Sequence, residues 1–411
     1  MNRLTISKRL RSLRMSLPLS NAGRNAKWRA LSSFHRIFTP KAAANRLNSE
    51  LAGDGRHRIG FSMVTGNSLE HMRNLISAFD DSESCLSVLV GDRSMTTIND
   101  EVDDFLNRRH TIAANRVIFP YALAKDLSLN LLLEAGAGRY PIPKGCKRIL
   151  YAHGMAGLNF SKYSESVRLI DHFDALFLNG PMHRRALELA AKQHGVALPD
   201  MYDIGYLRGD RLRAMSPSFD RHAFANRHNL DSAPIVTYAP TWGEFSSTKD
   251  WIETVVSACE SLGVNLFLRL HPFMFQSQSR YRTGGIDWNA ALRKLMAGTE
   301  RVRISTGHSI DELLLASDLL ITDVSGLGPE FLSLEKPVVF LPAEKFFNLF
   351  GRDRAEMWCR DRPEPTNAIE LRAAIVDALA GQGSRVPVET LVYNKGRSPE
   401  AAMQAIESLL G

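Results

Sequence analysis

The stretch DLLITDVSGLGPE, at residues 318–330, decides the fold class. It begins with a short apolar run that predicts a buried strand over 318–323, and it passes through small residues into a helical pattern over 326–334. A buried strand that leads directly into a helix is the repeating unit of a parallel sheet covered by helices on both faces. If the unit recurs along the chain, the protein belongs to the α/β class.

The same alternation continues on both sides of this stretch. In the C-terminal half, the other predicted strands are 234–240, 264–270, 301–305 and 337–342, and the helices are 249–262, 287–297, 309–316 and 367–381. In the N-terminal half, the predicted strands are 57–64, 85–90, 116–121, 147–152, 174–179 and 200–206, with helical patterns at 68–79, 98–109 and 181–195. We therefore predict a GT-B-type α/β fold, in which two doubly wound parallel-sheet domains face each other and ligands bind outside the carboxyl ends of the strands.

Length and composition agree with this organisation. The 411 residues suit two to three domains. A polar, broken stretch at 212–233 marks the joint, so we place an N-terminal domain at 49–215 and a C-terminal domain at 230–395, with a closing helix within 396–411. No stretch approaches ~20 uninterrupted apolar residues, so the sequence predicts no transmembrane helix.

The basic character of the chain belongs to a tail at residues 1–48. This tail holds eleven Lys and Arg and no acid, which leaves 40 basic against 44 acidic residues elsewhere and argues against a nucleic-acid partner. Ile6, Leu10, Leu13 and Leu17 recur at helical spacing between arginines, which is typical of a basic amphipathic helix on an anionic membrane surface. A solvated disordered tail and an organellar transit peptide are alternative interpretations.

The cysteines are scattered, with no CxxC pair and no histidine at ligand spacing. We therefore expect no metal site, no cofactor and no disulfide framework. A reducing compartment follows, so we expect a cytoplasmic protein that can attach to the inner face of the membrane through its tail. The four residues concerned are Cys85, Cys146, Cys259 and Cys359.

Polar residues that follow predicted strands are the candidates for chemistry. His153 and Gly154 come directly after the strand 147–152, which suggests a general base that faces the cleft between the domains. The alternative is a histidine that only bonds a loop. At the end of the strand 264–270, Arg269 and His271 point to the same side, and two cationic donors there suit a diphosphate. A surface salt-bridge pair is the alternative.

The turn after strand 318–323 is the second half of this candidate site. Asp323, Ser325 and Gly326 lead into a helix whose free N–H groups form an anion cradle, and Glu330 lies one turn further, where it could accept the hydroxyls of a ribose. An ordinary strand–helix turn capped by Ser325 is the alternative. After strand 234–240, Thr241 and Trp242 are placed to line the cleft, and the alternative is an aromatic ring that covers the edge of the core.

Five segments, in order over roughly residues 145–345, resemble the CDP-glycerol glycerophosphotransferase family, the teichoic acid polymerases and primases of bacterial walls. The segments are His153-Gly154, Ile204 to Asp210, Tyr238 to Trp242, Leu268 to Pro272, and Ser317 to Ser325 followed by Leu334 to Val338.

The resemblance implies a GT-B transferase. In that family a hydroxyl of a polymer or lipid-linked acceptor attacks the β-phosphate of a CDP-activated alditol, and CMP leaves. By this resemblance His153 is the general base and His271 the second catalytic residue. Arg269, Thr241, Asp323, Ser325, Gly326 and Glu330 bind the diphosphate and nucleotide of the donor. The domain 49–215 then takes the acceptor side and 230–395 the donor side.

Two departures bear on the donor. Met155 and Ala156 follow His153-Gly154 where the family usually has Thr-Pro, and Val324-Ser325-Gly326 stands where it usually has Tyr-Ser-Ser. The run 325–330 also resembles sugar-nucleotide enzymes of GT-B type, including UDP-GlcNAc 2-epimerase-like proteins. A glycosyltransferase that uses a UDP- or CDP-sugar is therefore the alternative function, and a nucleotide-binding scaffold without catalysis is a third.

Overall fold

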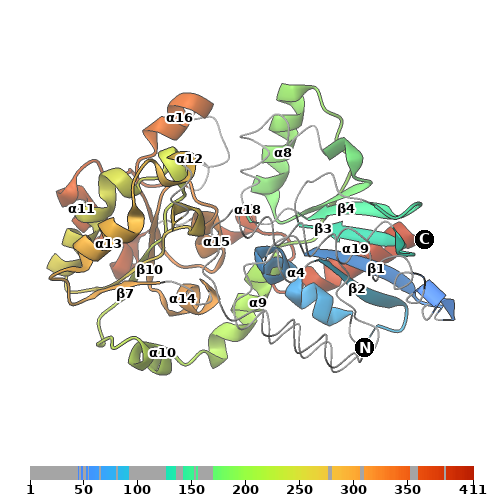
Figure 1. Ribbon diagram of the computed structural model, residues 1–411, viewed down its shortest axis with the longest axis horizontal. Coiled ribbons are helices and arrows are strands. Elements are labelled where there is room, and N and C mark those ends of the chain that lie inside the picture. The colour runs from blue at the N-terminus through green and yellow to red at the C-terminus, as the bar shows by residue number, and fades with distance from the viewer. Residues whose placement is uncertain are drawn as a thin grey trace, which may run out of the picture.

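The structure is a computed structural model, and it contains two parallel sheets that lie side by side, each covered by helices (Figure 1). The α/β class predicted from the alternation of strands and helices is confirmed. The tail 1–48 falls outside the described residues, apart from Asn45 and Asn48. The structure describes residues 45, 48–49, 52–53, 55–63, 66–79, 82–91, 126–135, 142–151, 154–155, 170–275, 280–305, 310–351, 360–383 and 386–411.

The first sheet has six parallel strands in the order β2-β1-β3-β4-β5-β6. Alternate residues of these strands face opposite layers: Ile149 and Tyr151 pack with helices α4 and α19, whereas Leu150 packs with helix α8. The elements are β1 (His57–Met63), α4 (Gly66–Ala78), β2 (Cys85–Gly91), β3 (Leu131–Glu134), β4 (Lys147–Tyr151), β5 (Ala175–Leu178), α8 (Pro181–His194), β6 (Asp200–Asp203) and α19 (Ser398–Leu410).

Strand β3 was not expected from the sequence. Its residues, Leu-Leu-Leu-Glu, all favour helices, and four residues are too few to show an alternating pattern. Pairing with β1 and β4 on either side makes the strand instead, because Leu131 is aligned with both Ile59 and Lys147. The predicted strand 116–121 and helix 98–109 lie outside the described residues.

The second sheet has five parallel strands in the order β11-β10-β7-β8-β9, and each overlaps a predicted strand. Its two faces are covered by different helices. The elements are β7 (Ile235–Tyr238), α11 (Thr248–Ser261), β8 (Asn265–Leu268), α12 (Arg280–Thr283), α13 (Trp288–Met296), β9 (Val302–Ile304), α14 (Ile310–Ala316), β10 (Leu319–Thr322), α15 (Leu327–Ser333), β11 (Val338–Phe340), α16 (Glu344–Phe350) and α17 (Ala368–Asp377).

The strand order of the second sheet locates a ligand site. The chain runs outward from β7 through β8 to β9, and then returns to the other side of β7 to form β10 and β11. The connections therefore diverge between β7 and β10, and such a switch point opens a crevice at the carboxyl ends of the strands. The segments that begin at Ala239 and Asp323 leave the sheet at this point.

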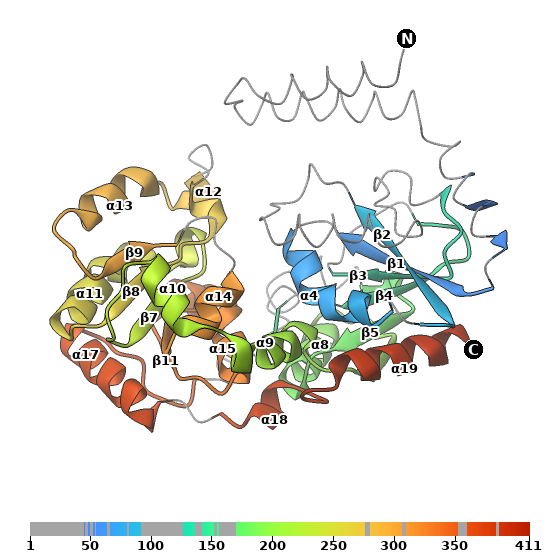
Figure 2. The same cartoon turned by 90° about the horizontal axis from the view of Figure 1, so that it is seen from below.

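Helix α9 (Leu207–Met215) lies between the two units (Figure 2), and the shorter α10 (Arg221–Arg227) follows it. These helices extend into the stretch predicted to be a broken joint. The N–H of Leu207 donates to the Tyr151 hydroxyl at 3.1 Å, which fixes the first turn of α9 to strand β4. The Asp220 carboxylate accepts from the Ala223 N–H at 2.8 Å and caps α10.

The chain then returns from the second unit to the first. We call residues 386–397, which include α18 (Val388–Leu391), the C-terminal crossing. Its Tyr393 N–H donates to the Asn179 carbonyl at 2.8 Å, and the close fit requires glycine at position 180, where an added Cβ would lie 1.9 Å from the Leu391 carbonyl oxygen. Helix α19 follows and packs beside α4 in the first core (Figures 1 and 2).

Asp210 of α9 fastens this crossing. Its two carboxylate oxygens accept from the backbone N–H groups of Gly396 and Ser398, each at 2.8 Å. The predicted closing helix thus lies on the first sheet, while the domain boundaries at 215, 230 and 395 stay predictions. None of the helices in the described part of the chain has the length and apolar character needed to cross a bilayer.

Candidate active site

Arg269 stands at the carboxyl end of β8, beside the switch point. Its Nη1 donates to the carbonyl and the hydroxyl of Ser305 at 3.1 and 3.3 Å, and no carboxylate of the described residues lies within ion-pair distance. Burial and the nearby positive charge of Arg208 lower the pKa of Arg269. A partly buried guanidinium without a carboxylate partner favours the binding of an anionic ligand.

His271 is a neutral hydrogen-bond donor. Its Nδ1 accepts from the Phe273 N–H at 3.1 Å, so the proton of the neutral ring lies on Nε2. Burial, with Arg269 and Arg282 adding to it, lowers the pKa of His271 to about 4. The structure thus corrects the expectation of two adjacent cations: Arg269 carries the charge, and His271 supplies an uncharged N–H.

An aromatic group packs on this edge of the sheet. The Trp242 ring lies 6.0 Å from the His271 ring and 5.2 Å from that of Phe273, centroid to centroid. Tyr281 adds an edge contact to Trp242 at 5.5 Å and is 51% exposed. Trp242 therefore packs against the second core beside the His271 ring, and a role in lining the cleft stays a prediction.

Asp323 links two segments at the switch point, and its predicted contact with the donor stays a prediction. One carboxylate oxygen accepts from the Thr241 N–H and the other from the Ser247 N–H, both at 2.7 Å, and only 1% of the residue is exposed. Burial raises the pKa of Asp323, and these two N–H groups counteract it. The carboxylate thus ties the loop after β7 to the end of β10, while the partly buried Thr241 side chain stays a candidate for donor contact.

Ser325 and Gly326 lie at the start of α15, where the Ser325 hydroxyl accepts from the Leu327 N–H at 3.4 Å. Both residues are partly exposed, and α15 begins directly after them. The Ser325 carbonyl accepts from the Gly328 N–H at 3.1 Å, whereas the N–H groups of Ser325 and Gly326 donate to none of the described residues. These two N–H groups lie at the same carboxyl-end edge of the sheet as Arg269, across the switch point from it, and N–H groups at such a place suit phosphate oxygens.

Glu330 lies where the two units meet. It is 5% exposed, and its Oε2 accepts from Arg208 at 2.9 Å. A Cβ added to Gly154, in the first unit, would lie 3.9 Å from its Oε1. Burial raises the pKa of Glu330, and Arg208 counteracts the rise. The predicted ribose-binding carboxylate therefore has one oxygen already bonded.

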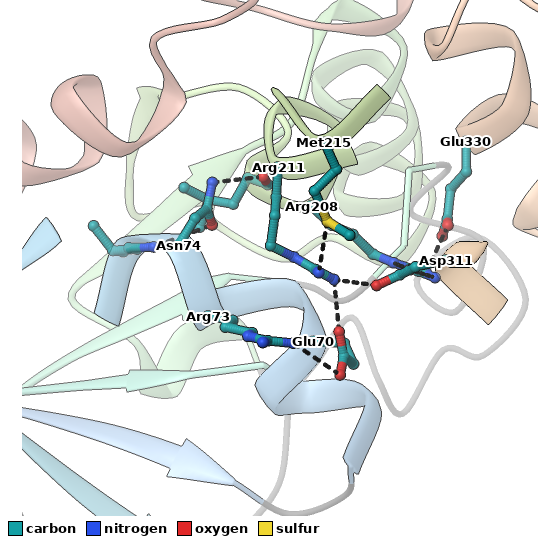
Figure 3. A network of polar contacts seen from close by, with 10 residues as sticks. Glu70, Arg73, Asn74, Arg208, Arg211, Met215, Asp311 and Glu330 are labelled. Carbon is teal, nitrogen blue, oxygen red and sulfur yellow. Dashed lines mark hydrogen bonds and ion pairs between the residues drawn. The ribbon is translucent and has the colours of Figure 1, made fainter. Parts of the chain in front are cut away.

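A buried ionic network joins the units through α9 (Figure 3). Arg208 donates through Nε and Nη2 to Asp311 Oδ1 at 2.9 and 2.6 Å, besides its bond to Glu330. Arg211, one turn further, donates to Glu70 of α4 at 2.6 Å and also to Asp311. Burial by itself raises the pKa of Asp311, but the two arginines outweigh it and hold that pKa well below its usual range.

This network was missed from the sequence. Arg208 and Arg211 are three residues apart, so they share one face of a helix. That spacing was the available signal, and it fell between the predicted strand 200–206 and the predicted joint 212–233, where no helix was expected. The acids lie up to 141 residues away in the sequence, as for Glu70 and Arg211, so no local pattern could have named them.

The first unit contributes the turn at Gly154. Its backbone has a φ of +89°, which favours glycine, and its carbonyl accepts from Asn179 Nδ2 at 2.7 Å. The neighbouring His153 lies outside the described residues, so its role as a general base stays a prediction.

Two facing parallel-sheet units, with the candidate site at the switch point of the second, define a GT-B fold, and solved structures of this class match the chain. The structure of the wall teichoic acid polymerase TagF matches with 14% identity and a TM-score of 0.56, covering 94% of this chain and 97% of that one. UDP-GlcNAc 2-epimerase from Neisseria meningitidis, bound to UDP-GlcNAc, matches with 12% identity and a TM-score of 0.55, covering 86% and 99%. At these identities the similarity shows the fold.

A known protein family matches the central part of the sequence. Residues 155–346 match the family described as CDP-Glycerol:Poly(glycerophosphate) glycerophosphotransferase. This match, over slightly less than half of the chain, supports the resemblance predicted from the five motifs and the class of enzyme, a glycerophosphotransferase-like phosphotransferase. No curated protein matches the chain.

Proposed function

We propose that this protein transfers a glycerol phosphate, or a related alditol phosphate, from a CDP-activated donor to a hydroxyl of a polymer or lipid-linked acceptor of the cell surface, with release of CMP. The family match over 155–346 supports the donor class. One of the matching solved structures, a variant of the polymerase TagF with 15% identity and a TM-score of 0.54, was soaked with CDPG. Attachment to the membrane through residues 1–48 is part of the proposal and rests on the sequence alone.

The observation that carries the proposal is the uncompensated charge of Arg269. Its guanidinium lies at the strand ends without a carboxylate partner among the described residues, beside the neutral Nε2–H of His271. The free N–H groups of Ser325 and Gly326 follow β10, which is separated from β8 by the single strand β7. One fixed charge and several neutral donors suit a diphosphate, whose negative charge is spread over several oxygens.

The reaction can be written from these groups. The acceptor oxygen attacks the phosphorus that bears the alditol, and the bond from that phosphorus to the bridging oxygen breaks. CMP leaves with the bridging oxygen and its electron pair, so negative charge grows on the nucleotide side, where Arg269 and His271 stabilise it. The acceptor proton passes to a general base, for which we propose His153. Glu330 accepts ribose hydroxyls through its remaining oxygen.

The test is CMP release from CDP-glycerol by the wild type, Arg269→Ala and a matched control, Arg303→Ala. Arg303 also donates to backbone carbonyls, but it does so on β9 near His228 and Asn229. Loss of a hydrogen bond to a charged partner is worth about 1.5–3 kcal/mol, so Arg269→Ala should lose about ten- to a hundredfold in kcat/KM. Equal losses in both variants, or no CMP release by the wild type, would overturn the proposal.

The second candidate is a glycosyltransferase that uses a sugar nucleotide. It is favoured by the similarity to UDP-GlcNAc 2-epimerases, such as that from Methanocaldococcus jannaschii, with 11% identity, coverage of 86% of this chain and 99% of that one, and a TM-score of 0.56. The products separate the two candidates, because a glycosyltransferase releases a nucleoside diphosphate. Release of UDP or CDP from a sugar nucleotide, with CDP-glycerol left intact, would select this alternative.

A further inference from the structure

The Arg208 guanidinium is held on two sides at once. Asp311 accepts from its Nε and Nη2, and Glu330 accepts from its Nη1, all within 2.9 Å. Arg208 is 4% exposed. Because a guanidinium is planar, two bonds to Asp311 fix the plane of the group and hence the direction in which Nη1 points.

This geometry favours the ionised form of the Glu330 carboxylate. Burial raises the pKa of that carboxylate, so without a positive partner it would tend to take up a proton and lose an acceptor. Arg208 favours the ionised form and binds Oε2, which leaves Oε1 as the oxygen that faces the Gly154 turn of the first unit. The buried Tyr206 hydroxyl is a further polar group beside this carboxylate, and it favours the ionised form of Glu330.

Arg208 reaches Glu330 from outside the second unit. It lies in the first turn of α9, whose Leu207 N–H is bonded to Tyr151 of β4 and whose Arg211 is bonded to Glu70 of α4. The orientation of a carboxylate in the donor-side unit therefore depends on a helix that is fastened to the acceptor-side unit.

We infer that Arg208 is a positioning residue for nucleotide recognition, which orients Glu330 so that Oε1 accepts the ribose hydroxyls of the donor. The inference rests on the proposed function. It also makes ribose binding sensitive to the placement of α9, and so links recognition of the nucleotide to the arrangement of the two units.

The test compares the affinities of CMP and 2′,3′-dideoxy-CMP by titration calorimetry. In the wild type, the hydroxyls that meet an ionised carboxylate should favour CMP by about tenfold or more. Arg208→Lys keeps the charge but loses the planar fork, so the ratio should fall to about threefold or less, while the affinity for the dideoxy nucleotide stays unchanged. Glu330→Gln should lower the ratio similarly, and the double variant should lose no more than Glu330→Gln alone.

The control is Arg213→Lys on the same helix, since Arg213 donates to Asp210 and to the Ser333 carbonyl and touches neither Asp311 nor Glu330. If Arg208→Lys fails to fold, Asp311→Asn loosens the same guanidinium and should lower the ratio in the same way. If a folded Arg208→Lys or Asp311→Asn protein prefers CMP over 2′,3′-dideoxy-CMP as strongly as the wild type does, the positioning role is overturned. A wild type that binds no CMP would instead point to failure of the proposed function.

Discussion

Glu70 is the member of the buried network whose ionisation opposes folding. Burial raises its pKa from 4.5 to about 7, the negative charge of Asp311 adds to the rise, and Arg211 and Arg73 only partly reverse it. Because the folded-state pKa lies above the unfolded value, the protonated form is favoured by folding. Stability is therefore complete below the unfolded pKa and is lost as the pH rises through the folded one, a total of about 3 kcal/mol at ~1.36 kcal/mol per pKa unit.

Glu70→Gln removes this dependence, because the amide keeps the shape and an acceptor for Arg211 but cannot ionise. The free energy of unfolding of the variant, minus that of the wild type, should rise by about 2 kcal/mol between pH 5 and pH 8, the part of the total that this window covers. Urea denaturation followed by the fluorescence of the five tryptophans, at constant ionic strength, measures it. Other titrating groups cancel in the difference.

The matched control is Glu335→Gln, which removes an exposed carboxylate paired with Lys395 at 2.6 Å. Exposed pairs contribute little, so its difference from the wild type should be nearly independent of pH. A flat difference for Glu70→Gln, or one that falls as the pH rises, would show that Arg211 dominates over burial and would refute the reasoning.

The remaining predictions concern the site and the packing around it. Because His271 binds as a neutral donor, the affinity for CDP-glycerol should hardly change between pH 6 and pH 8, and calorimetry in buffers of different ionisation enthalpy should show almost no proton uptake; a tenfold weakening per pH unit would contradict this. Gly180→Ala should lower the free energy of unfolding by at least about 1–3 kcal/mol, since its Cβ would overlap the Leu391 carbonyl; an unchanged urea midpoint would count against that contact. Asp323→Asn places a side-chain N–H against a backbone N–H, so it should lower the affinity for CDP-glycerol and the Tm together. Arg269→Ala should lower the affinity alone. An Asp323→Asn protein of normal Tm would exclude the positioning role.

Local patterns were sufficient to place three candidate residues at one edge of the second sheet. Each strand of the second sheet is a short apolar run, and a polar residue after such a run must emerge at the strand-end edge. Arg269, His271 and Ser325 could therefore be placed together before any coordinates were known. The charge state of His271 could not be predicted from the sequence, because it depends on burial and on Arg282, which lies on α12.

Partners that are distant in the sequence were beyond the reach of such patterns. Asp323 follows a strand as expected, but only the fold reveals that the N–H groups of Thr241 and Ser247 each bond one of its carboxylate oxygens. Asp210 belongs to a motif that family resemblance picked out, yet its partners are Gly396 and Ser398 in the C-terminal crossing. Resemblance indicated that these residues matter, and the coordinates supplied the physical reason.

The C-terminal crossing makes the second unit an insertion within the first. The chain leaves the first sheet through α9 and returns through residues 386–397 to add α19 to the first core. A single peptide-bond cleavage therefore cannot release either unit, and a transplanted donor-side unit must be exchanged at two junctions. Two covalent connections also restrict motion. Relative rotation of the units is possible about the line that joins α9 to the crossing, whereas a single linker would allow rotation in any direction.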